Sequence, residues 1–217
     1  MADYAALRLN MVEAQVRTND VTEIRIHDAM REVPRERFVP TARRALAYAD
    51  VPVEIANGRY MLDPRSFAKM LQLADFSGNE IVLDVACGTG YSTVVLARLA
   101  KYVVGLEQDA DLVRIASDLV PQLGAVNATV VQGGLTEGFA GKAPYDVIMI
   151  NGAIEQVPDS LTRQLTDGGR LIAIVQDGPR GRGQIFVREH GGISGRAAFE
   201  ATVPALTGFR KVVGFVF

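Results

Sequence analysis

The sequence predicts a doubly wound α/β fold in which helices cover both faces of a mostly parallel sheet. Short apolar runs alternate with helical patterns through the middle of the chain, and the runs are continuously apolar rather than alternating. Such strands are typical of a parallel sheet that is buried on both faces. The 217 residues suffice for one large core. We expect a helical N-terminal appendage over residues 1–59 and a sheet domain over residues 60–217, which together form one compact unit.

Helical patterns dominate the start of the chain. Within the first 50 residues, apolar side chains recur at spacings of three and four, interrupted by Pro34 and Pro40. Another helix is predicted from Pro64 to the break at Ser77-Gly78. Its start is well defined, because proline suits the first turn of a helix and Asp63 is a good N-cap.

The predicted strands follow this helix. Five apolar runs are expected to form the parallel part of the sheet: 81–85, 102–107, 128–132, 145–150 and 170–175. The segments between them are long enough for crossover helices. Near the C-terminus, runs 184–189 and 197–203 flank Gly191-Gly192 and predict an antiparallel hairpin. The segment GPRGRG, residues 178–183, is interpreted as a mobile connection.

Composition disfavours several classes of protein. A net charge of −2 argues against nucleic acid or an anionic membrane as the main partner, since both select clustered positive charge. With a single cysteine, Cys87, and two distant histidines, His27 and His190, we expect no metal site. His27 is expected on a helix surface. No apolar run reaches the roughly 18 residues of a membrane helix, so we expect a soluble, cytoplasmic protein.

The strongest local motif is VLDVACGTGY, residues 82–91. Gly88 and Gly90 allow the backbone to approach a ligand and to adopt positive φ, and the helix that follows offers free N–H groups. This combination predicts a site for a nucleotide-like cofactor. A dinucleotide fingerprint would require a third glycine where Thr93 stands, so a hydride-transfer enzyme is disfavoured.

Polar residues near this loop extend the candidate site. Glu107 ends the next strand, where its carboxylate can accept hydrogen bonds from both ribose hydroxyls of a nucleoside; the alternative is a solvated residue at a strand end. Asp84 either orients the glycine loop or contacts the cofactor, and its alternative is a turn residue. Asn151 follows the fourth strand and faces the cleft. Cys87 is interpreted as a small packing residue.

The form DVACGTG resembles the loop of S-adenosylmethionine-dependent methyltransferases, with Ala86 where many carry a first glycine. Across nearly the whole chain, a series of segments closely resembles the protein-L-isoaspartate O-methyltransferase family. They are MVEAQVRTNDV, AMREVPRERFVP, ALAYADVPVEI, the glycine loop, APYDVIMINGAIEQVP and LTRQLTDGGRLIAIV. The most specific part is VPRERFVP followed by AYAD.

This resemblance implies a Rossmann-like methyltransferase fold and S-adenosylmethionine as the cofactor. The methyl acceptor would be the α-carboxylate of an isoaspartyl residue in a damaged protein or peptide. A carboxylate is already a nucleophile, so positioning and partial desolvation would carry most of the acceleration. The cofactor-binding residues expected from the loop and the resemblance together are Asp84, Ala86, Gly88, Gly90, Glu107, Gly134, Leu135 and Asn151.

Two positions depart from the family pattern. The resemblance aligns Tyr60, Leu62 and Asp63 with the acceptor loop, where Leu62 replaces a serine that lies at the substrate carboxylate in the family. Gly134 replaces an aspartate that holds the adenine amino group. Two alternatives therefore stand beside isoaspartyl methylation: a methyltransferase with another acceptor, and a catalytically silent relative that serves as a binding module.

Overall fold

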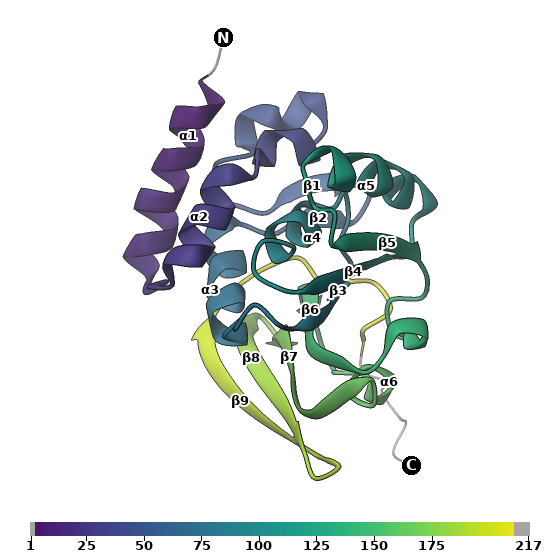
Figure 1. The fold of residues 1–217 in the computed structure, drawn as a ribbon. Coiled ribbons are helices and arrows are strands. Elements are labelled where there is room, and N and C mark those ends of the chain that lie inside the picture. Colours follow the sequence, from purple (N-terminus) through teal and green to yellow (C-terminus); the bar gives the residue numbers. More distant parts are fainter. Residues whose placement is uncertain (1–2, 211–217) are drawn as a thin grey trace.

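The computed structural model describes residues 3–210 and contains a seven-stranded sheet in the order β5-β4-β3-β6-β7-β8-β9 (Figure 1). Its strands are β3 (Ile81–Val85), β4 (Tyr102–Glu107), β5 (Ala128–Gln132), β6 (Tyr145–Ile154), β7 (Leu165–Asp177), β8 (Arg180–Glu189) and β9 (Gly192–Glu200). Strands β3 to β7 pair in parallel, whereas β8 and β9 are antiparallel. The predicted fold class is confirmed.

Side chains from both faces of the parallel strands are buried. Val82 and Leu83 are neighbours in β3 but belong to separate core clusters, and Val103 and Val104 in β4 do the same. Because successive residues of a strand point to opposite faces, each face needs its own cover. This double burial explains why the strands are continuously apolar.

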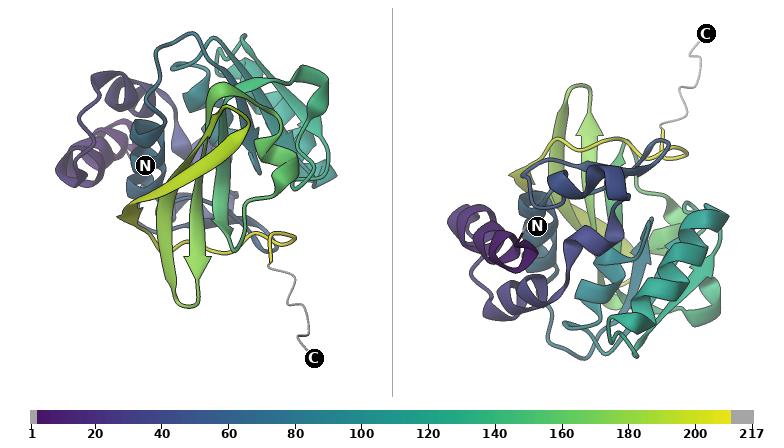
Figure 2. Two further views of the ribbon diagram at one scale, coloured as in Figure 1. Left: turned by 90° about the horizontal axis from the view of Figure 1, so that it is seen from below. Right: turned by 90° about the horizontal axis from the view of Figure 1, so that it is seen from above.

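The helices surround this sheet. They are α1 (Tyr4–Met11), α2 (Ile24–Glu32), α3 (Pro64–Ala74), α4 (Tyr91–Leu96), α5 (Ala110–Gln122) and α6 (Asp159–Thr162). Shorter helical turns are η1 (Val12–Val16), η2 (Arg17–Asn19), η3 (Arg35–Phe38), η4 (Thr41–Leu46) and η5 (Ala140–Lys142). The helices of the first 50 residues stand beside α3 at one side of the molecule (Figure 2). Between β5 and β6 the expected crossover helix is missing, and only the turn η5 is found there.

A small hairpin that was not predicted joins the N-terminal helices to α3. Strands β1 (Val53–Ala56) and β2 (Arg59–Met61) pair antiparallel across a turn at Asn57-Gly58. Gly58 has φ +68°, a left-handed backbone conformation that glycine adopts without steric cost. The proposed domain boundary at residue 59/60 falls within β2, and the division into two parts stays a prediction.

The C-terminal hairpin has the predicted antiparallel pairing, but its first strand starts earlier than expected. Segment 178–183 is not a mobile connection, because Asp177 pairs with Arg180 and β8 begins there. Its glycines serve close packing in the sheet. A Cβ on Gly181 would lie 2.2 Å from the Ala201 carbonyl oxygen, and one on Gly183 would lie 2.3 Å from the Phe199 ring.

The position of His27 also differs from the prediction. The side chain is buried, and its Nε2 lies 2.8 Å from the Val21 carbonyl oxygen, because the turn before α2 folds back over the helix.

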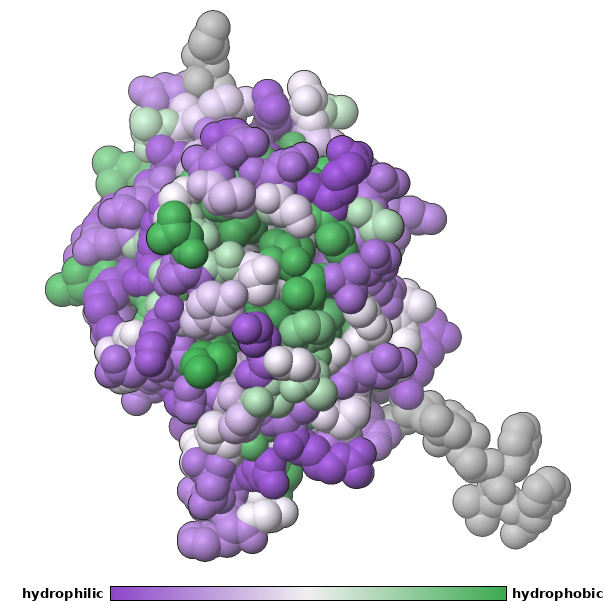
Figure 3. Space-filling view, turned by 45° about the vertical axis from the view of Figure 1, so that its right-hand side comes forward, coloured by the Kyte–Doolittle hydropathy of each residue, from purple (hydrophilic) through white to green (hydrophobic). Residues whose placement is uncertain are grey.

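Hydrophilic side chains surround an apolar centre on one face of the molecule (Figure 3). Across residues 3–210, no helix combines the length and apolarity needed to cross a membrane.

Candidate functional site

The glycine loop lies at the carboxyl end of β3, beside β6. The strand order reverses between these two strands, and ligands of such sheets bind in the crevice at this point. Ala86, Gly88 and Gly90 all have positive φ, at +62°, +59° and +96°. A left-handed backbone at three of five positions produces a sharp turn. Within it, the N–H groups of Cys87 and Gly90 donate to the carbonyl oxygens of Leu106 and Cys87.

Asp84 lies below this turn and holds it together. Its carboxylate accepts hydrogen bonds from the Ser92 hydroxyl at 2.7 Å, the Thr93 hydroxyl at 2.6 Å and the Asn151 amide nitrogen at 2.6 Å. Burial raises the pKa of the Asp84 carboxyl to about 6, although the three hydrogen bonds oppose this shift. Of the two roles considered for Asp84, the contacts support orientation of the loop.

Asn151 links the two central strands. Besides Asp84, its amide nitrogen also donates to the Val85 carbonyl at 3.1 Å, and the side chain lines the crevice. Both contacts fix the carboxyl end of β3 against β6. Asn151 therefore has a clear structural part in the site, and its contact with a cofactor stays a prediction.

Glu107 ends β4 with a fully buried carboxylate. One oxygen accepts hydrogen bonds from the backbone N–H groups of Gln108 at 2.8 Å and Asp109 at 3.1 Å. The other accepts from the Gly88 N–H at 2.9 Å and from Arg59 Nη2 at 2.5 Å. The carboxylate thus ties the glycine loop to β4, and the alternative of a solvated strand end is wrong.

The hairpin β1–β2 covers these groups. Arg59 reaches Glu107 from β2, and the Ile55 side chain of β1 lies over the glycine loop, where its Cδ1 is 2.4 Å from the position of a Cβ on Gly88. The cavity between hairpin and loop has a volume of about 20 Å³. That is room for about one water molecule, whereas ligand pockets measure about 300–1,000 Å³.

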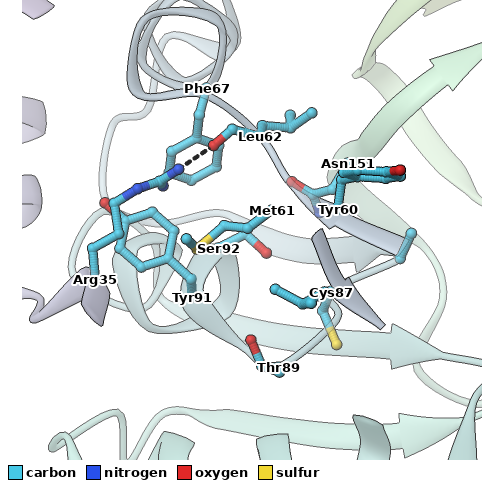
Figure 4. Close-up of a pocket in the computed structure, with 12 residues that line it drawn as sticks. Arg35, Tyr60, Met61, Leu62, Phe67, Cys87, Thr89, Tyr91, Ser92 and Asn151 are labelled. Carbon is cyan, nitrogen blue, oxygen red and sulfur yellow. Dashed lines mark hydrogen bonds between the residues drawn. The ribbon is translucent and has the colours of Figure 1, made fainter. Parts of the chain in front are cut away.

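Figure 4 shows the acceptor loop on the other side of this cavity. Tyr60, Met61 and Leu62 line it opposite Cys87 and Thr89 of the glycine loop. Arg35 of η3 is fully buried, donates to the Leu62 carbonyl and donates to the Ala47 carbonyl at 2.6 Å. Its guanidinium thereby fixes the backbone of the loop, while the Leu62 side chain is 4% exposed and presents hydrocarbon to the cavity.

Asp63 acts as the predicted helix cap. Its carboxylate accepts a hydrogen bond from the Ser66 N–H at 2.8 Å, and Pro64 occupies the first turn of α3. Asp63 does not line the cavity, so the sequence-based expectation that it meets the acceptor has no direct contact to support it.

Gly134 and Leu135 lie in the turn after β5. Leu135 is buried in the core, and Gly134 accepts backbone hydrogen bonds from Glu137 and Gly138, each at 3.2 Å. The carboxyl carbon of Glu137 is 2.9 Å from the position of a Cβ on Gly134. A carboxylate therefore lies next to the position where the family's aspartate is absent, and it has no hydrogen bond or ion pair within residues 3–210.

Other reactive groups give no competing site. Cys87 is buried, and burial raises the pKa of its thiol well above the ordinary value, which favours the packing role. In the described part of the chain, no cluster of three or more His, Cys, Asp or Glu side chains is arranged to hold a metal ion.

Three residues of the site were missed at the sequence level: Arg35, Arg59 and Glu137. The Asn-Gly pair at 57–58 is a hairpin signal that would have placed Arg59 opposite Ala56. Arg35 and Glu137 carry no comparable local signal, because their contacts depend on tertiary structure.

The chain is similar to known proteins over most of its length. The family model for protein-L-isoaspartate(D-aspartate) O-methyltransferase matches residues 8–204. A protein-L-isoaspartate O-methyltransferase of Koribacter versatilis is 36% identical over 172 residues, which are 79% of this chain and 78% of the relative. One of Shewanella sediminis is 39% identical over 169 residues, 78% of this chain and 69% of that protein.

Solved structures support the fold. One structure, named protein-L-isoaspartate O-methyltransferase, has a TM-score of 0.80 at 24% identity. The match covers 94% of this chain and 66% of the solved chain. A Plasmodium falciparum protein described as the same enzyme was solved in complex with S-adenosyl-L-homocysteine. It also has a TM-score of 0.80, at 20% identity, and the match covers 95% of this chain and 99% of that protein. These two structures show the fold, and the family model and the sequence relatives show that the chain belongs to the protein-L-isoaspartate(D-aspartate) O-methyltransferase family.

Proposed function

We propose that this protein is an S-adenosylmethionine-dependent methyltransferase that methylates the α-carboxylate of isoaspartyl residues in peptides and damaged proteins. The observation that carries the proposal is the match to the family model over residues 8–204, which includes both the glycine loop and the acceptor loop. The proposal takes the methyl acceptor from the names of the relatives.

The residues present fit the cofactor. Glycine at position 88 leaves free the space that a Cβ would fill, and only the movable Ile55 side chain occupies that space here. Glu107 would hold the ribose hydroxyls, and the free carboxylate of Glu137 would accept from the adenine amino group in place of the missing aspartate. When bound, the cofactor supplies the electrophilic methyl group. The shape of this half of the site would depend on Ala86, Gly90, Gly134 and Leu135. Its glycine loop would be positioned by Asp84 and Asn151.

The acceptor half would position the substrate carboxylate and exclude water from it. Tyr60, Met61 and Leu62 present large side chains to the cavity, and Arg35 holds their backbone in place. A drier environment strengthens attack by a carboxylate that has lost its hydration shell. Leu62 offers no hydrogen bond in return, and an unpaired polar group costs about 1–3 kcal/mol.

The proposal is tested by measuring the rate of methyl transfer to an isoaspartyl peptide and to the peptide of the same sequence with a normal aspartyl residue. We expect transfer to the isoaspartyl peptide alone, and we expect Leu62→Ser to raise the rate by restoring a hydroxyl donor. The matched control is Leu62→Ala, which removes the same apolar bulk without adding a donor. Both variants lose core packing worth about 2–5 kcal/mol, so thermal unfolding must accompany the assay. A wild-type rate equal to that of a serine-bearing relative would contradict the inference on Leu62.

A second candidate function is methylation of a different acceptor, and Leu62 is the observation that favours it. An apolar surface of Tyr60, Met61 and Leu62 suits a hydrophobic small molecule or another peptide better than a carboxylate. Binding of S-adenosylhomocysteine without transfer to the isoaspartyl peptide would favour this candidate. If titration with S-adenosylhomocysteine gave no saturable heat, both methyltransferase functions would be excluded. The remaining alternative would be a catalytically silent relative that serves as a binding module.

We also place this activity in the cytoplasm, where S-adenosylmethionine and ageing proteins are both present. Fractionation of cells followed by immunodetection tests this location, and recovery of the protein in another compartment would contradict it.

A further inference from the structure

The carboxylate of Glu107 has no free acceptor position. Its two oxygens offer about four lone-pair sites. Within the described residues, four donors use them: the N–H groups of Gln108, Asp109 and Gly88, and the guanidinium of Arg59. Any ligand hydroxyl that binds Glu107 must therefore displace one of these donors.

Arg59 is the donor that can leave. The other three are backbone groups of the glycine loop and of the turn after β4, whose positions the sheet fixes. Arg59 stands at the start of β2, a strand of three residues that pairs with β1 alone. Among residues 3–210, its buried Nε has no hydrogen-bond partner, so this guanidinium is not fully satisfied where it lies.

Ile55 reinforces the same closure. Its side chain, 9% exposed as a residue, covers Gly88 from β1, while Arg59 covers Glu107 from β2. The two contacts lie on the inner face of one hairpin, together with Val53 and Met61. Loss of one contact therefore weakens the other, because both depend on the position of the same short element.

We propose that Arg59 competes with the ribose of the cofactor for Glu107, so that cofactor binding breaks this ion pair and displaces the β1–β2 hairpin. The inference rests on the proposed function for the identity of the nucleoside. The displaced hairpin carries Tyr60 and Met61, which line the acceptor side of the cavity. Occupation of the cofactor half thus reshapes the acceptor half.

Calorimetric titration of the full chain with S-adenosylhomocysteine tests this competition. We expect Arg59→Gln to bind about tenfold more tightly than wild type, because the closed state no longer lowers the fraction of binding-competent protein. Ile55→Ala is expected to act in the same direction by about threefold. The matched control is Arg44→Gln, which removes a positive charge from an exposed side chain of η4 outside the site; its affinity stays at the wild-type value.

Hydrogen exchange of the wild-type protein gives a readout that needs no variant. We expect the hairpin amides of residues 54–61 to change their exchange rate on addition of S-adenosylhomocysteine, whereas the amides of β6 do not. Equal or weaker binding by Arg59→Gln, or unchanged exchange in the hairpin at saturating ligand, would overturn the inference and leave the proposed function intact. Failure of the wild type and every variant to bind would instead overturn the proposed function, and the competition with it.

Discussion

The two halves of the proposed site, one for the cofactor and one for the methyl acceptor, are built in different ways. The cofactor half lies at the end of two central strands, and its carboxylates are surrounded by donors, most of them from backbone groups or short hydroxyl side chains. The acceptor half is a three-residue strand and a loop, held from outside by the side chain of Arg35. We infer that the buried charges of the first half are more sensitive to substitution than the helix-cap charge of Asp63 in the second.

The largest effect is expected in the cofactor half. Glu107→Gln removes the counter-charge of Arg59, whose side chain is 10% exposed, and places an amide among four donors. Leaving one buried charge uncompensated costs about 3–5 kcal/mol of stability. Urea unfolding measures this loss, and the double variant with Arg59→Gln should recover a large part of it. A loss below about 1 kcal/mol would break the comparison, because the buried charge would then be no more sensitive than the helix cap of Asp63.

A pH series on Asp84→Asn tests the same half. The folded-state pKa of Asp84 is raised to about 6 from 3.8, so the native state holds its proton to higher pH than the unfolded chain. This group therefore lowers stability as pH rises through that window, by on the order of 3 kcal/mol. The variant should lack this decrease. Unfolding free energies of both proteins between pH 4 and pH 7 measure the difference; parallel curves would contradict the raised pKa.

Substitutions in the glycine loop give an intermediate effect. Gly88→Ala places a side chain at φ +59° and against Ile55, and we expect a loss of about 2 kcal/mol. Ala86 already has φ +62°, so Ala86→Gly should change stability by less than about 1 kcal/mol. Thermal unfolding of the pair measures both. Equal losses would show that the loop depends on side-chain packing rather than on backbone conformation.

The smallest effect is expected at Asp63, in the acceptor half. Asp63→Ala removes the cap of α3 and should cost about 1 kcal/mol, whereas Asp63→Asn keeps an accepting oxygen for Ser66 and should be nearly neutral. Methyl transfer by the asparagine variant should equal that of wild type. A fall in its rate with stability unchanged would assign the carboxylate a part in the reaction and would sharpen the boundary between the two halves.

The cofactor half was easier to predict from the sequence than the acceptor half. The ends of β3 and β4 were predicted to the residue, because the glycine loop follows β3 and the polar residues Glu107 to Asp109 end the apolar run of β4. Hairpin β1–β2 was missed, since strands of four and three residues show almost no periodicity and only Asn57-Gly58 marks the turn. Segment 178–183 was wrongly predicted to be a mobile connection, because the sequence does not distinguish a glycine required for close packing in a strand from a glycine in a loop.

Contacts that join distant segments were beyond sequence reasoning. Arg59 and Glu107 are 48 positions apart, and Arg35 and Leu62 are 27 apart. Neither spacing is a periodicity of a helix or a strand. The same limit applies to Glu137, whose carboxylate lies beside Gly134 through the shape of one turn.

Arg35 bonds to the carbonyl oxygen of Leu62, a group that every amino acid provides. The hydrogen bond that holds this loop therefore does not depend on which side chain stands at position 62. Under the proposed function, the residue that faces the acceptor can be exchanged during evolution in one mutational step that keeps this bond. Position 62 is for the same reason the natural starting point for engineering new acceptor preferences into this scaffold.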